Sequence, residues 1–74
     1  MQLHIKLLGM LKEHAPAEPI DWPEGTSIQA VLQRLGIGAG DVQICSVNGE
    51  LVRDPARQLA EGDELTVLPP VGGG

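Results

Sequence analysis

The stretch ELTVLPPVGGG, residues 64–74, ends the sequence with an alternating run, a double proline and three glycines. The alternation predicts a half-buried strand that turns Leu65 and Val67 toward a core. Glycine has no side chain to bury and loses more backbone entropy on ordering than any other residue. Glycines can, however, enter a slot that is too narrow for a Cβ atom. We therefore expect a folded domain over residues 1–70 and a flexible glycine tail over residues 71–74.

Three short elements are predicted near the start of the chain. Residues 2–7 alternate polar and apolar side chains, which is typical of a strand with its odd-numbered residues inward. Residues 10–14 suit a helical turn that stops before Pro16. Residues 19–23 (PIDWP) are predicted to form a short edge strand between two prolines, with Trp22 as its core anchor.

The clearest helix signal lies in the middle of the chain. Thr26 and Gln29 have the spacing of a capping box, with the threonine hydroxyl at the N-cap. Gly36 suits the left-handed position that ends a helix. Between them, apolar residues recur at the spacing of one helical stripe, which consists of Ile28, Val31, Leu32 and Leu35. This segment is expected to cover one face of a sheet.

A hairpin is predicted after the helix, because Asn48-Gly49 is a strong two-residue turn signal between the apolar runs 42–47 and 50–53. By parity, Cys45 faces the core and Ile44 faces out. With the final strand, these elements predict an α+β domain, in which one main helix packs on one face of a mixed sheet of about five strands. The other sheet face is left open. Its outward Leu68 and Ile44 indicate a partner-docking surface.

The composition excludes several classes of function. The net charge of −5 argues against a nucleic-acid partner, and one Trp with no Phe or Tyr leaves no platform for base stacking. One cysteine excludes an internal disulfide and a cysteine-based zinc site. The sequence shows neither a secretory signal pattern nor an apolar run of membrane-spanning length, so we expect a soluble cytoplasmic protein.

The chemically interesting side chains of the body have simpler structural interpretations. His4 lies on the outer face of a strand without a nucleophile, and His14 has no metal-ligand spacing to it. Cys45 has no nearby base to activate it, so we interpret it as a small buried hydrophobe. The glycine-rich loop 38–41 follows a helix, whereas phosphate-binding loops precede one. We expect no metal and no bound cofactor in this chain.

Four stretches in order resemble the ubiquitin-like β-grasp sulfur carriers. They are residues 47–52 (VNGELV), residues 59–65 (LAEGDEL), Pro69-Pro70-Val71 and the terminal Gly73-Gly74. This family includes the small subunit of molybdopterin synthase and the sulfur carrier of thiamine biosynthesis. The Pro-Pro-Val run and the long first connection are more similar to the molybdopterin synthase subunit. The resemblance implies a ubiquitin-like fold and a carrier that is not itself an enzyme.

The resemblance also implies a mechanism centred on the carboxylate of Gly74. An E1-like enzyme would activate it with ATP-Mg as an acyl adenylate. A sulfur donor protein would then convert it to a thiocarboxylate, which delivers sulfur in molybdopterin synthesis through the synthase large subunit. Gly72, Gly73, Val71, Pro70 and Pro69 would pass through the partner's channel.

Three alternatives remain open at this point. One is the thiamine-pathway carrier, whose partner would be thiazole synthase. Another is a ubiquitin-like modifier that is joined covalently to proteins through Gly74. The third is a non-covalent interaction module.

Overall fold

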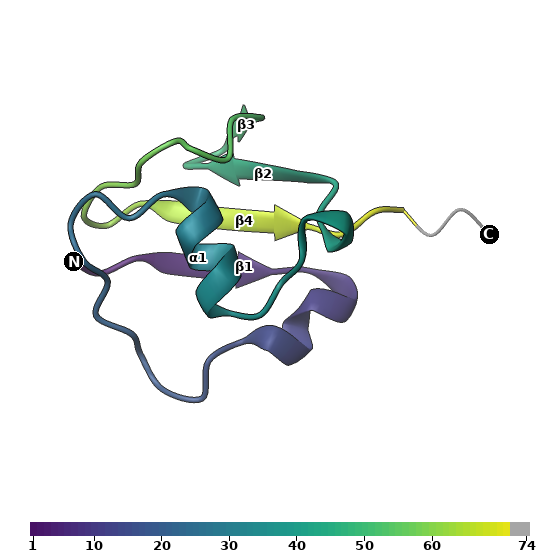
Figure 1. The fold of residues 1–74 in the computed structure, drawn as a ribbon, viewed down its shortest axis with the longest axis horizontal. Helices are drawn as coiled ribbons and strands as arrows, with labels where there is room; N and C mark the ends of the chain where they lie inside the picture. Colours follow the sequence, from purple (N-terminus) through teal and green to yellow (C-terminus); the bar gives the residue numbers. More distant parts are fainter. Residues whose placement is uncertain (72–74) are drawn as a thin grey trace.

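The computed structural model describes residues 1–71 as one sheet with three short helices. In chain order the elements are β1 (His4–Leu7), the 3-10 helix η1 (Gly9–His14), α1 (Ile28–Arg34), the 3-10 helix η2 (Ala39–Asp41), β2 (Ile44–Val47), β3 (Glu50–Val52) and β4 (Glu64–Leu68). The strand order is β1-β4-β2-β3, with β1 parallel to β4 and the other pairs antiparallel. Figure 1 shows α1 crossing one face of this sheet. The predicted two-layer α+β architecture is confirmed.

The core is centred on β4. Leu65 and Val67 are both fully buried, as the alternation predicts. On β2, Val47 and Cys45 lie directly across from them. Burying one large aliphatic side chain stabilises a protein by about 1.5–3 kcal/mol, so the two middle strands supply much of the folding energy. From the helix, the predicted stripe contributes three buried residues, Ile28, Val31 and Leu35.

The helix begins one residue later than the capping-box pattern predicts. Ser27, not Thr26, is the N-cap, and its hydroxyl accepts a hydrogen bond from the backbone N–H of Ala30 at 3.1 Å. The Thr26 hydroxyl is buried and donates to the carbonyl of Pro23, so it is not free to cap the helix. The other end follows the prediction, because Gly36 takes a φ of 76° just after the helix.

The strand predicted over residues 19–23 is not formed in the described chain, so the sheet has one strand fewer than expected. Within the described chain, the segment is hydrogen-bonded to the residues ahead of β1 through Met1 alone: the N–H of Trp22 donates to the carbonyl of Met1 at 2.9 Å, and the Met1 amino group donates to the carbonyl of Trp22 and, at 3.0 Å, to Oδ1 of Asp21. Pro19 and Pro23 take two N–H donors out of this segment, which disfavours a ladder. The Trp22 side chain nevertheless fills the core as predicted, at 4% exposure.

The turn between β2 and β3 is tied to the start of β4. Asn48 and Gly49 have φ values of 53° and 86°, which is the backbone of a tight hairpin turn. The Asn48 amide donates to Oδ1 of Asp63 at 2.9 Å and accepts from the N–H of Glu64 at 2.9 Å. The other Asp63 oxygen, Oδ2, accepts from the N–H of Ala60 at 2.8 Å. Two turns that are distant in sequence are therefore held together through one carboxylate.

The hydrogen bonds of Asp63 predict that part of the protein's folding stability is lost at acidic pH. The N–H of Ala60, and after it the amide of Asn48, hold the pKa of Asp63 below its ordinary value. A carboxyl whose pKa is lowered by folding stabilises the protein above its unfolded-state pKa, and that contribution is lost as pH falls through the lowered value. We expect Asp63→Asn, which cannot ionise, to lose less stability than the native protein on acidification. Urea unfolding at neutral and acidic pH measures this, and equal losses for both proteins would contradict it.

Candidate functional site

The candidate site is the root of the tail, where β4 ends. The carbonyl of Val67 accepts from the N–H of Leu8 at 3.2 Å, and the carbonyl of Leu68 accepts from the N–H of Gln43 at 2.8 Å. Leu8 directly follows β1 and Gln43 directly precedes β2, the two neighbours of β4, so the last residues of the strand are held from both sides. Pro69 has no N–H to continue the ladder. The regular pairing of the sheet therefore stops at this residue.

Beyond Pro69 the chain leaves the body. Pro69 is half-buried, Pro70 is exposed and Val71 is 90% exposed. In Figure 1 this last described segment (yellow) extends past the end of the sheet and away from the other elements. Gly72, Gly73 and Gly74 lie outside the described residues, so their predicted role in a partner's channel stays a prediction. The structure does place the root of the tail where a partner can reach it.

The open sheet face carries the predicted docking residues next to this root. Ile44 and Leu68 are direct cross-strand partners and are both half-buried. Leu51, which is 66% exposed, lies opposite Ser46 on the same face. From η1, Met10 is also 70% exposed, whereas Leu11 folds into the core. Their assignment as a partner surface stays a prediction, but Ile44 and Leu68 do lie together beside the tail.

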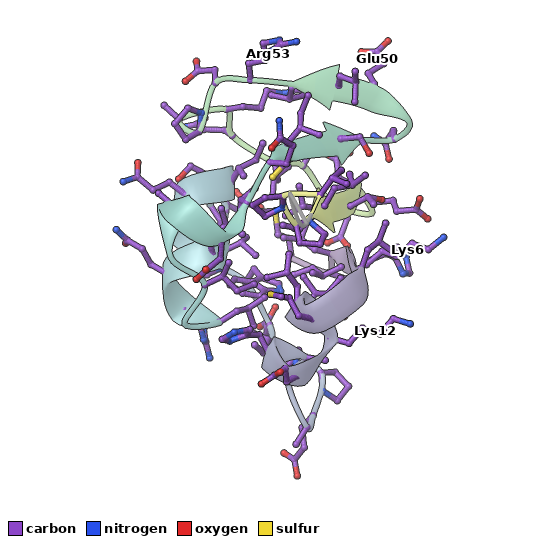
Figure 2. All side chains as sticks on the ribbon, turned by 90° about the vertical axis from the view of Figure 1, so that its right-hand side faces the viewer. Lys6, Lys12, Glu50 and Arg53 are labelled. Atoms are coloured by element: carbon purple, nitrogen blue, oxygen red, sulfur yellow. The ribbon has the colours of Figure 1, made fainter. Side chains whose placement is uncertain are left out.

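Charged side chains stand out in the view toward the side on which the tail leaves (Figure 2). In this view Lys6 and Lys12 extend together away from α1. Lys6 lies opposite Thr66 on the open face. At the outer edge of the sheet, Glu50 and Arg53 extend from the β3 segment (Figure 2). Charges at an edge strand discourage pairing with another sheet.

The structure shows where the two histidines and the cysteine, for which the sequence indicates no chemical role, lie in the fold. His14 places Nδ1 at 3.1 Å from the carbonyl of Leu35, at the end of α1. His4 is exposed and lies opposite Glu64. Cys45 is 5% exposed, and burial raises the pKa of its thiol, which makes the reactive thiolate scarce. Over residues 1–71, no group of three or more potential ligands could hold a metal ion.

Sequence reasoning missed the residues that hold the tail root. Leu8 and Gln43 act through backbone N–H groups, which every residue except proline carries, so no side-chain pattern marks them. Gly9 does leave a signal, because a glycine between a strand and a helical turn indicates an unusual backbone. Its φ of 58° confirms that, but its neighbour in space, Pro69, is not evident from the sequence. None of the helices in the described region is long and apolar enough to span a bilayer.

In this mixed sheet the outer strand β1 runs parallel to β4, α1 crosses one face, and the tail leaves β4. This arrangement is the ubiquitin-like β-grasp fold of the sulfur carriers. Residues 5–74 match the model of the ThiS family, and the chain belongs to that family. Small carriers of this family are not enzymes themselves and work with E1-like activating enzymes.

One solved structure supports the fold over the whole chain. The crystal structure of SAMP1 from Haloferax volcanii has a TM-score of 0.72 to this chain at 23% sequence identity, and the similarity covers 100% of both chains. No match is found among curated proteins. The family match confirms the predicted membership of the ubiquitin-like sulfur-carrier family, whereas the predicted similarity to the molybdopterin synthase subunit stays a prediction.

Proposed function

We propose that this chain carries sulfur as a thiocarboxylate at Gly74 and delivers it in molybdopterin biosynthesis. The observation that supports this most directly is the tail root. β4 is anchored on both sides up to Leu68, and the chain then runs outward through an exposed Val71 toward three glycines. A folded body joined through an exposed Val71 to terminal glycines suits a carrier that presents one reactive group to other enzymes.

The chemistry belongs to the terminal carboxylate and to the partners. A carboxylate is a poor electrophile, so an E1-like enzyme joins its oxygen to the α-phosphate of ATP-Mg and releases pyrophosphate. A persulfide sulfur then attacks the acyl carbon, and AMP leaves. A thiol cleaves the resulting acyl disulfide and leaves the thiocarboxylate on Gly74. ATP and Mg²⁺ are bound by the activating enzyme, and this chain contributes only the acyl group.

The body contributes recognition. Ile44 and Leu68 provide an apolar contact beside the tail, and Lys6 and Lys12 extend from the same side of the molecule. Apolar residues at the centre of a contact with charges at its rim are typical of protein interfaces. We infer that the E1-like enzyme and the synthase large subunit dock on this face, with acidic groups opposite the two lysines. Docking here would deliver the tail toward the partner's active site.

The assignment to the molybdopterin pathway depends on smaller sequence features than the assignment to the carrier family does. Pro69-Pro70-Val71 and the long first connection, which contains η1, support the molybdopterin pathway. The ThiS family match supports the thiamine pathway equally as an alternative, with thiazole synthase as the partner. Supplying the thiocarboxylated protein to each synthase separately distinguishes them, since only the true acceptor consumes the sulfur.

The proposal predicts a specific mass change. After incubation with the activating enzyme, ATP-Mg and a persulfide donor, we expect intact-protein mass spectrometry to show one oxygen exchanged for one sulfur. Fragmentation should place the exchange on Gly74. An unchanged mass with every E1-like enzyme of the source organism would disprove the carrier function. Higher-mass protein adducts joined through Gly74 would instead indicate the covalent modifier.

A further inference from the structure

Gly9 lies close against the root of the tail. Gly9 opens η1 with a φ of +58°. A Cβ atom at this position would lie 3.1 Å from Cγ of Pro69 and 4.0 Å from its Cδ. The first distance is tighter than ordinary van der Waals contact, and Pro69 has a rigid ring that cannot rotate away. The absence of a side chain at Gly9 is therefore what lets the Pro69 ring lie in this place.

The Pro69 ring is the point at which the direction of the tail is set. The preceding residues are fixed by the bonds from Leu8 to Val67 and from Gln43 to Leu68. Proline holds its own φ near −65°, so the ring position largely determines where the next residues point. After it, Pro70 and Val71 are exposed, and no backbone hydrogen bond is made by either residue within the described chain. Gly9 therefore lies directly against the rigid base of the tail.

We propose that Gly9 is a positioning residue that fixes the exit direction of the tail by seating the Pro69 ring. The inference rests on the proposed function, in which the Gly74 carboxylate must reach a phosphorus atom held by a partner. Correct placement of a reacting group accounts for a large share of catalysis, and displacements of about 1 Å cost up to about 100-fold in rate. An error in direction at Pro69 is passed on to Pro70, whose ring also fixes its φ, so the point from which the glycines start is displaced.

The chain offers a matched control for the backbone strain. Gly9→Ala introduces both a strained φ and the contact with Pro69. Gly62→Ala introduces a comparably strained backbone, at a φ of +80°, but no atom lies within 4 Å of its Cβ. Pro69→Ala removes the Cγ atom that the new methyl group would meet. The double variant Gly9→Ala/Pro69→Ala therefore restores the space while keeping the strain at Gly9.

The test is the adenylation kinetics of the full chain with the E1-like enzyme. For Gly9→Ala we expect kcat to fall about tenfold with little change in KM, because docking through the sheet face is intact while the end is misdirected. Gly62→Ala should leave kcat within about twofold of the native value, because its strained turn precedes β4 and its Cβ meets no atom within 4 Å, so the tail root is not displaced. The double variant should match Pro69→Ala alone. Equal effects of the two alanine variants, or additive losses in the double variant, would overturn the proposal.

A second measurement separates this inference from the proposed function. The residual dipolar coupling of the Val71 N–H, measured by NMR on the isolated protein, reports the orientation of the tail's base without any partner. We expect it to change in Gly9→Ala and to stay native in Gly62→Ala. An unchanged coupling in Gly9→Ala refutes the positioning role even if the chain is a sulfur carrier. A changed coupling in a protein that no enzyme adenylates supports the positioning role and refutes the carrier function.

Discussion

Deletion of Gly73 and Gly74 is expected to abolish adenylation and sulfur exchange completely. The deletion moves the only carboxylate that the proposed chemistry uses two residues back, and the partner's phosphate is then out of reach. The fold should be unaffected, since Val71 is already 90% exposed and no core residue of the described chain lies beyond Val67. Pyrophosphate release with the E1-like enzyme measures the first step, and thermal unfolding checks the fold.

A semisynthetic protein with a C-terminal carboxamide on Gly74 is the matched control. It keeps all three glycines but has no carboxylate oxygen to attack ATP, so we expect it to bind the partner and to release no pyrophosphate. Binding without reaction would show that the carboxylate, and not tail length alone, is required. Pyrophosphate release by either altered protein, above the level without carrier, would contradict the assignment of the chemistry to Gly74.

Replacement of Leu68 with glutamate is expected to weaken binding of the activating enzyme by about 30-fold or more. Leu68 lies beside its cross-strand partner Ile44 and directly precedes the tail root, so it lies at the centre of the proposed contact. A central apolar contact residue is worth about 2 kcal/mol or more, which corresponds to about 30-fold in Kd. Burying a carboxylate there without a partner adds a further penalty. Isothermal titration calorimetry with the E1-like enzyme measures the change.

Gln33→Glu controls for the added charge. Gln33 is exposed on α1, which covers the opposite face of the sheet, and glutamate is a good helix former. It changes the net charge by the same amount as Leu68→Glu, so we expect Kd to stay within about twofold. Comparable weakening by both variants would show that long-range electrostatics, rather than contact at Leu68, controls binding, and the docking surface would have to be reassigned.

Most of the fold could be predicted because its signals are local. The alternation of residues 64–68 identified the strand and its buried side, and Leu65 and Val67 are indeed fully buried. The apolar stripe on α1 and the Asn48-Gly49 turn are equally local, since each depends on residues within a few positions of one another. Element type and buried face follow from such patterns.

The failed predictions involve competition between neighbouring groups. Thr26 and Ser27 both carry a hydroxyl suited to an N-cap, and the choice depends on the Pro23 carbonyl that engages Thr26. The strand predicted over residues 19–23 has the right alternation, yet only Trp22 makes a backbone bond to the start of the chain. In both cases the local pattern was correct and the available partners decided the outcome.

The sequence by itself determined that this protein has a small α+β body and a final strand followed by prolines and glycines. It also determined that the body lacks an evident catalytic group, because composition and spacing are properties of the chain alone. Only the tertiary structure decided that Ile44 lies beside Leu68 and that Gly9 lies against Pro69. Those contacts join residues that are far apart in the chain, so they exist only once strand order and packing have brought β1, β2 and β4 together.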